Sequence, residues 1–117
     1  MHRNKAIYII ALAVLMLSCA LTKGRKSEPY PRSMMPTVYY TEGIKAGWMG
    51  DASYAASMFR RAVALDSLHA PSYYELAGLY AETNPEVAIP YSARACRLDT
   101  ANVWYRAQTG RLMIVTR

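Results

Sequence analysis

The residues that could do chemistry are few, and one short segment holds most of them. Asp66, Ser67 and His69 are the residue types of a nucleophilic triad, in which a histidine activates a serine hydroxyl. They are sequence neighbours at the predicted end of a helix, however, and no sharp strand-to-helix turn presents the serine. His69 and Cys96 alone are too few for a zinc site, which needs three or four ligands. We therefore expect His69 to be a solvated or capping residue of a turn.

Other catalytic and phosphate-binding patterns are missing from the sequence. The acidic residues are scattered singly, so no pair of carboxylates is placed for general acid–base catalysis. Residues 47–51 (GWMGD) lack the spacing of a phosphate-binding loop and predict a turn between two helices. We therefore expect a protein that is not an enzyme, that needs no cofactor or metal, and that has no small-molecule substrate.

The positive charge of the chain is concentrated near its N-terminus. The net charge is +6, but residues 38–117 contain eight Lys and Arg against seven Asp and Glu, which leaves +1 there. A protein that binds nucleic acid normally carries a basic face on its folded part, where cationic side chains replace the counterions of the phosphates. The charge distribution therefore argues against nucleic-acid binding.

The N-terminal segment has the organisation of an export signal. Residues 1–5 (MHRNK) are basic, and residues 6–17 (AIYIIALAVLML) form an apolar run of twelve. A run of this length suits the central part of a signal peptide, whereas a helix that spans a bilayer needs about 20 apolar residues. We expect residues 1–18 to be a signal peptide that directs export.

The end of this run resembles the lipobox of bacterial lipoproteins. Cys19 follows the small residue Ser18, and in that family the cysteine at this place is lipidated and becomes the mature N-terminus. Met16 and Leu17 depart from the commonest pattern, which has Leu three residues before the cysteine and a small residue two before it. The resemblance implies lipidation of Cys19 and a membrane anchor. An ordinary secretory signal, cleaved near residues 18–20, and an uncleaved anchor helix are the alternatives.

A linker follows the lipobox. Residues 20–36 contain three prolines and one glycine among Lys, Arg and Ser, without apolar periodicity, and therefore predict an extended tether. We assign the lipidated cysteine and the tether to residues 19–37 and the folded domain to 38–117. With Cys19 acylated, Cys96 has no partner for a disulfide, and its place on an apolar helix stripe predicts a small core residue.

The folded part contains an internal repeat. Residues 61–66 (RAVALD) and 94–99 (RACRLD) agree at four of six positions, with an offset of 33 between them. A series of small residues, Gly43, Ala77 and Gly110, recurs at spacings of 34 and 33. A period of this length is typical of stacked helical hairpins, each of which buries its apolar face against its neighbours.

The repeat resembles the tetratricopeptide repeat (TPR) family, in which a first helix with Trp or Tyr, Leu, Gly or Ala, and Tyr precedes a second helix with Ala, an aromatic residue and Ala. The matching residues are Tyr73, Leu76, Ala77 and Tyr80 in a first helix, and Ala55, Phe59, Ala62, Ala88 and Ala95 in two second helices. The resemblance implies an all-α fold. It would be a short TPR-like α-solenoid of antiparallel helix hairpins, with about five helices and two and a half repeats, after an N-terminal signal or anchor helix. Repeat one would span 38–69, repeat two 70–101, and the first helix of a third, truncated repeat 102–117.

The second repeat departs most from the family pattern. Ser92 takes the aromatic position of its second helix, and Thr109 takes a position where Leu is usual. Asn84 and Pro85 predict an N-cap and the first residue of the second helix. Pro90 lies beyond the first turn, where proline removes a backbone donor and disrupts a helix. We therefore expect either a kink at Pro90 or a later start of this helix.

In TPR proteins the first helices line a concave groove that binds a peptide or a partner helix. Carried over position by position, the resemblance implies that the groove is lined by Tyr40, Ile44 and Trp48, by Tyr74, Gly78 and Glu82, and by Trp104 and Arg111. Tyr, Trp and Arg are enriched at the hot spots of protein interfaces. The alternative for Tyr40 and Tyr74 is that they cover seams between helices.

These features together predict a non-enzymatic scaffold or adaptor for protein–protein interactions. The chain would bind a partner peptide or helix in its groove. Its lipid anchor would hold it on the periplasmic side of a bacterial cell envelope, at the outer membrane. Two alternatives are a soluble secreted adaptor and a truncated fragment of a longer TPR lipoprotein with a structural role only.

Overall fold

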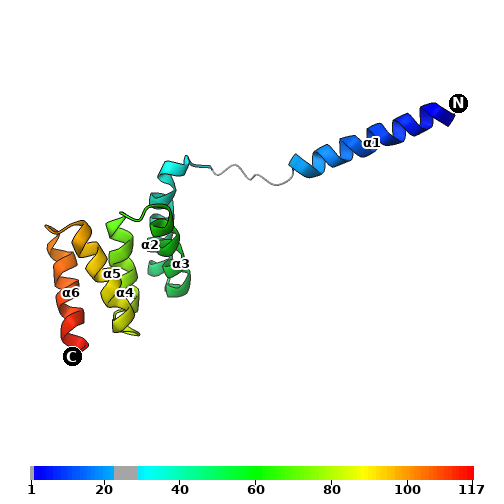
Figure 1. Ribbon diagram of the computed structural model, residues 1–117. Coiled ribbons are helices and arrows are strands. Elements are labelled where there is room, and N and C mark those ends of the chain that lie inside the picture. Colours follow the sequence, from blue (N-terminus) through cyan, green and yellow to red (C-terminus); the bar gives the residue numbers. More distant parts are fainter. Residues whose placement is uncertain (1, 23–28) are drawn as a thin grey trace.

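The computed structural model describes residues 2–22 and 29–117, and these residues are all-helical (Figure 1). They form six α-helices and one short 3-10 helix, with no strand among them. The α-helices are α1 His2–Thr22, α2 Met35–Trp48, α3 Ala52–Leu65, α4 Ala70–Tyr80, α5 Pro85–Leu98 and α6 Val103–Val115, and the 3-10 helix is η1 Arg32–Met34. The prediction of an all-α chain is confirmed.

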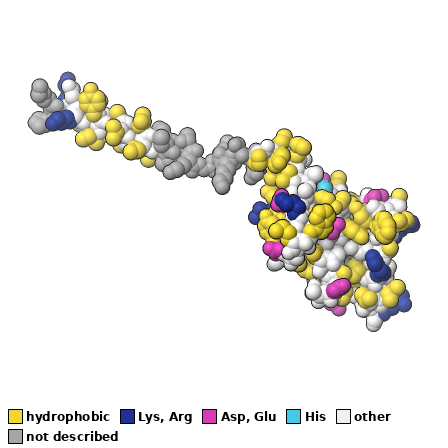
Figure 2. Space-filling view, turned by 180° about the vertical axis from the view of Figure 1, so that it is seen from behind, with side chains coloured by type: hydrophobic (Ala, Val, Ile, Leu, Met, Phe, Trp, Pro, Cys, Tyr) yellow, Lys and Arg dark blue, Asp and Glu magenta, His cyan; other side chains and the backbone are white. Residues whose placement is uncertain are grey.

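Residues 6–17 of the helix α1 are all apolar, so this part of the helix is apolar on every side. Its side chains from Arg3 to Leu17 are exposed, and Figure 2 shows apolar side chains along it with basic side chains at its N-terminal end. None of the helices in the two described ranges is long and apolar enough to cross a membrane. The side chain of Cys19 and the tether residues 23–28 lie outside the described part of the chain.

Polar side chains cap the first turns of three helices of the folded part, α3, α5 and α6. The carboxylate of Asp51 accepts a hydrogen bond of 3.0 Å from a backbone N–H in the first turn of α3. The amide oxygens of Asn84 and Asn102 do the same for α5 and α6. Each of these bonds satisfies a donor that the helix itself leaves unpaired. Gly50, with φ of +81°, supplies the left-handed turn between α2 and α3. The expected N-cap at Asn84 is confirmed.

One helix start differs from the sequence-based expectation, and one of two alternatives for another helix is excluded. The helix α2 begins at Met35, three residues before the expected start at 38, and both Met35 and Pro36 are buried. Proline is tolerated here because the first turn has no partner for its missing N–H. The helix α5 begins at Pro85 and continues through Pro90, so the expectation of a later start is wrong. The Asn84 cap sets its first residue instead.

Neighbouring helices pack against one another in chain order. The helices α2 and α3 lie in contact, as do α4 and α5, and each pair is joined by a turn of only a few residues. Helices that are joined so closely and pack along their length run in opposite directions. The pairs α3–α4 and α5–α6 are also in contact, and Figure 1 shows α2 to α6 side by side.

The core consists of small residues packed around a few large ones. Ala62 and Ala95 of the repeated sequence are completely buried, in α3 and α5 respectively. Phe59 of α3 is 2 % exposed and lies so close to α2 that a Cβ added to Gly43 would come within 2.5 Å of its ring. A second core cluster joins Leu112 of α6 to residues of α4 and α5. Small residues therefore let the helices approach closely.

The two hairpins share a contact at equivalent positions. The guanidinium of Arg61 lies 5.7 Å from the ring centre of Tyr39, and that of Arg94 lies 5.9 Å from the ring centre of Tyr73. In the sequence the two arginines differ by an offset of 33 and the two tyrosines by an offset of 34. The internal sequence repeat therefore corresponds to a repeated three-dimensional contact.

Two polar side chains pair between α5 and α6. Ser92 is completely buried in α5. Its Oγ lies 2.6 Å from Oγ1 of Thr109 in α6. A buried hydroxyl is costly unless it is hydrogen-bonded, so the two polar residues are acceptable as a pair.

Candidate functional site

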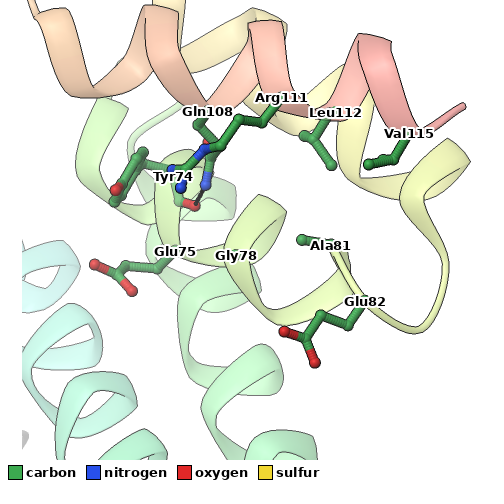
Figure 3. A pocket seen from close by; sticks show the side chains of 9 residues that line it. All are labelled: Tyr74, Glu75, Gly78, Ala81, Glu82, Gln108, Arg111, Leu112 and Val115. Carbon is green, nitrogen blue, oxygen red and sulfur yellow. Dashed lines mark hydrogen bonds between the residues drawn. The ribbon is translucent and has the colours of Figure 1, made fainter.

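A hollow of about 500 Å³ lies between α4 and α6. Figure 3 shows the side chains that line it, from the two facing helices. They are Tyr74, Glu75, Gly78, Ala81, Glu82, Gln108, Arg111, Leu112 and Val115. Tyr74, Glu82 and Arg111 were predicted from the sequence to bind a partner, and the structure brings these three together.

The two walls of the hollow are equivalent positions of the internal repeat. Glu75 lies on α4, and Glu82 follows seven residues later in the turn after that helix, and both line the same wall of the hollow. Gln108 and Val115, displaced from them by the repeat offset of 33, are the corresponding residues of α6. Sequence reasoning missed Glu75, Gln108 and Val115, although the same offset applied to α4 would have found the pair on α6.

Gln108 holds the two helices together at one end of the hollow. Its Nε2 donates a hydrogen bond of 3.0 Å to the backbone carbonyl of Tyr74 on α4, drawn as a dashed line in Figure 3. The side chain is 7 % exposed, and its Oε1 is buried without a hydrogen-bond partner in the described part of the chain. An amide oxygen in this state retains an unmet capacity to accept a hydrogen bond.

The hollow contains charges of both signs. The carboxylate of Glu75 comes from α4, that of Glu82 from the turn after α4, and the guanidinium of Arg111 from α6 (Figure 3). Glu75 is half-buried, and this burial raises the pKa of its carboxyl above the ordinary value, because removal from water disfavours the charged form. With two acids and one base, the hollow is better suited to a cationic group than to a phosphate.

Tyr74 forms part of the wall and also part of a seam. Its ring centre lies 5.0 Å from that of Tyr105 on α6, and the Tyr74 side chain is half-buried. Tyr105 itself is buried, which raises the pKa of its hydroxyl, and the charge of Asp99 raises it further. Tyr74 therefore combines the two roles that the sequence left open, packing between helices and lining a surface.

The predicted groove residues of α2 lie outside this hollow. Tyr40 and Ile44 are half-buried and pack against the first core cluster. The Tyr40 ring lies 5.9 Å from Phe59 and 5.4 Å from His69, centre to centre, at the α2–α3–α4 seam. Burial raises the pKa of the Tyr40 hydroxyl, and the nearby Glu75 adds to this effect.

The two tryptophans are exposed and do not line the hollow. Trp48 is 86 % exposed at the end of α2, and Trp104 is 69 % exposed in the first turn of α6. Neither is among the residues that surround the space between α4 and α6. They are open to contact with other molecules, but at separate places on the surface.

The residues that resemble a triad make local contacts. Nδ1 of His69 lies 2.8 Å from Oγ of Ser72, in the first turn of α4. The Asp66 carboxylate accepts a hydrogen bond from the backbone N–H of Leu68. His69 occupies the N-cap position of α4, but its side chain caps no backbone N–H. Within residues 2–22 and 29–117, no group of three or more His, Cys, Asp or Glu side chains is placed to hold a metal ion.

Comparison with known proteins assigns no family to this chain. No family model matches the sequence, and no curated protein is significantly similar to it. The function must therefore be argued from the hollow between α4 and α6 and from the patterns of the sequence. That hollow has an apolar floor around Leu112, a tyrosine on one wall and three charged side chains at its rim, which suits recognition of another molecule.

Proposed function

We propose that this chain is a non-enzymatic scaffold that binds a segment of a partner protein in the hollow between α4 and α6. In this proposal α2 to α6 form a short TPR-like solenoid, and the hollow is part of its concave groove. The observation that carries the proposal is that Tyr74, Glu82 and Arg111, chosen from the repeat pattern, line one hollow of about 500 Å³.

The composition of the hollow indicates what kind of segment fits. Leu112 and Ala81 offer an apolar surface for an aliphatic side chain. Glu75 and Glu82 together outweigh the charge of Arg111, so a Lys or Arg beside the apolar residue is favoured. We therefore propose a peptide segment with a basic residue next to an apolar one as the partner.

The proposal also includes a lipid anchor at Cys19. It is supported by the basic residues 1–5, the apolar residues 6–17 and the small Ser18 before the cysteine, which together resemble a lipoprotein signal. Acyl chains on one cysteine bind a membrane stably, because each buried methylene contributes about 0.8 kcal/mol. The scaffold would then face the periplasm of a bacterial envelope, held at the outer membrane.

Site-specific photo-cross-linking in cells tests the binding role. A photoreactive amino acid replaces Gly78, which is exposed on the α4 wall and whose Cβ would meet only Gln108, at 3.8 Å. The control places the same amino acid at Arg97, which is exposed on α5 and does not line the hollow. We expect a defined cross-linked partner at position 78 and none at position 97.

Charge reversal in the hollow makes the test specific. Glu82→Lys changes an exposed side chain at the rim, so the fold should be retained while attraction for a basic residue is lost. The cross-link at position 78 should then fall at least about tenfold, which corresponds to about 1.4 kcal/mol of binding free energy. An unchanged cross-link, or the same products at positions 78 and 97, would contradict the proposal.

A further inference from the structure

The helix α6 presents an apolar stripe on the side that faces away from the other helices. Val103, Ala107, Gly110 and Ile114 follow one another at spacings of four, three and four residues, so they form one line along the helix. All four are exposed, Val103 to 58 % and Ile114 to 72 %. The buried residues of α6 lie on the opposite side, and they are Tyr105, Gln108 and Leu112.

The position of α2 that is equivalent to Gly110 is covered by another helix. Gly43 and Gly110 occupy the same position in the first and the third repeat, with Ala77 between them in the second. At Gly43 an added Cβ would come within 2.5 Å of the Phe59 ring of α3, whereas at Gly110 no atom lies within 4 Å. The small residue in α2 therefore admits an aromatic side chain from a neighbouring helix, and the same position in α6 is open.

The charges beside the stripe point to the nature of a helix that would cover it. Arg106 and Arg111 flank the stripe on its two sides, and α6 contains no acidic residue. A second copy of α6 would bring arginines together, which is unfavourable. Each helix within residues 2–22 and 29–117 carries at most one acidic residue, so none of them complements this face well.

We propose that this face of α6 docks an amphipathic helix from a different protein. The docked helix has an aromatic side chain that enters the space at Gly110, and Asp or Glu residues on both sides of its apolar stripe. This surface is distinct from the hollow between α4 and α6, because the stripe and the residues that line the hollow lie on different sides of α6; Arg111 alone is shared. The proposal does not depend on what the hollow binds.

Designed peptides can test this partner chemistry directly. Two peptides of about 20 residues, long enough to form helices, share one stripe of Ala with a central Phe, and one has Glu and the other Lys at the flanking positions. Binding to the full chain in a mild non-ionic detergent is measured by fluorescence anisotropy. We expect the Glu peptide to bind at least about tenfold more tightly than the Lys peptide, and the difference to shrink in high salt.

Two variants locate the binding on α6. Gly110→Leu adds a side chain where a Cβ would meet no atom within 4 Å, so we expect the fold to be retained while the docked helix is displaced. The matched control is Gly47→Leu, at an exposed helical glycine of α2 that also has no atom within 4 Å of an added Cβ. We expect Gly110→Leu and Arg106→Glu each to lower the affinity for the Glu peptide at least about tenfold. Gly47→Leu should leave this affinity unchanged.

Several results would overturn the proposal. The proposal is wrong if the Glu peptide does not bind or if the two peptides bind equally. It is also wrong if Gly110→Leu and Gly47→Leu change the affinity for the Glu peptide equally. A concentration-dependent dimer of the full chain that Gly110→Leu abolishes would show that a second copy occupies the face. Replacement of Trp48 by Phe leaves Trp104 as the single tryptophan. If the peptides do not bind and phosphatidylglycerol vesicles shift the Trp104 fluorescence to the blue, a lipid surface occupies this face of α6.

Discussion

At the scale of single residues, the space in front of a glycine decides what its substitution does. Gly43 and Gly47 both lie inside α2, four residues apart, yet their surroundings differ completely. The Phe59 ring stands within 3 Å of the place where a Cβ of Gly43 would be, and nothing lies within 4 Å of the corresponding place at Gly47. The same amino acid is therefore a packing requirement at one position and a weakness of the helix at the other.

Substitution of the two glycines by alanine should change stability in opposite directions. Gly43→Ala forces the buried Phe59 ring to move, and overpacking of this kind lowers the free energy of unfolding by about 1–3 kcal/mol. In Gly47→Ala the added methyl group meets no neighbour. The better helix propensity of alanine should therefore raise the free energy of unfolding by up to about 1 kcal/mol. Urea denaturation of the two variants beside the unmodified chain measures both effects. Equal changes would mean that Phe59 does not pack on Gly43.

Glu75 should make folding depend on pH. Its carboxyl has a raised pKa in the folded chain because it is buried, so between the ordinary and the raised value the folded state holds a proton that the unfolded state has lost. The contribution of Glu75 to the free energy of unfolding is therefore greatest below the ordinary pKa of glutamate. This contribution is lost as the pH rises through the raised value. Glu75→Gln should remove this loss and stabilise the chain at neutral pH.

Denaturation at a series of pH values checks the Glu75 prediction. Glu82→Gln is the control, since Glu82 lines the same hollow but is exposed. A decline in stability that persists in Glu75→Gln, or that disappears equally in Glu82→Gln, would show that Glu75 is not its source.

At the scale of helices, α5 forms in spite of a proline in its interior. Pro90 is exposed, and the helix runs through it from Pro85 to Leu98. Proline at this position removes the hydrogen bond to the carbonyl four residues earlier. The Asn84 cap and the burial of Ala88 and Ala95 stabilise the helix nevertheless. Tertiary packing thus outweighs local propensity in α5.

Replacement of Pro90 by alanine should stabilise the chain by about 2 kcal/mol. Alanine is favoured in a helix interior by about 3 kcal/mol, and the greater freedom of the unfolded chain offsets about 1 kcal/mol of this. Pro85→Ala is the matched control and should have little effect, because the first helical residue has no partner for its N–H. Thermal unfolding followed by circular dichroism compares the variants. A destabilised Pro90→Ala chain would mean that the proline ring is needed for packing.

At the scale of the whole molecule, the proposed anchor separates a membrane-bound end from a binding end. Labelling of cells with a clickable fatty acid should modify the wild-type chain at Cys19, and Cys19→Ser should abolish the label and leave the precursor uncleaved. Cys96→Ser, which removes the half-buried cysteine of α5, is the control and should retain the label. Wild-type chain without label, or label retained in Cys19→Ser, would reject the lipid anchor.

The sequence by itself determined the helices of this protein. The internal repeat, the cap at Asn84 and the small residues Ala62 and Ala95 predicted where helices form and which positions are buried. These signals are local, since a cap acts within one turn and a buried face follows from the helical period. Patterns within one helix and its flanking turns were enough for them.

Only the tertiary structure decided which of the predicted groove residues share a site. Tyr40 and Tyr74 occupy equivalent positions of successive repeats, yet Tyr40 packs at a seam with Phe59 and His69 whereas Tyr74 lines the hollow. The hydrogen bond of Gln108 to the Tyr74 carbonyl could not be predicted, because it depends on how closely α6 approaches α4. That distance is set by the sizes of all the side chains between the helices, which no local pattern records.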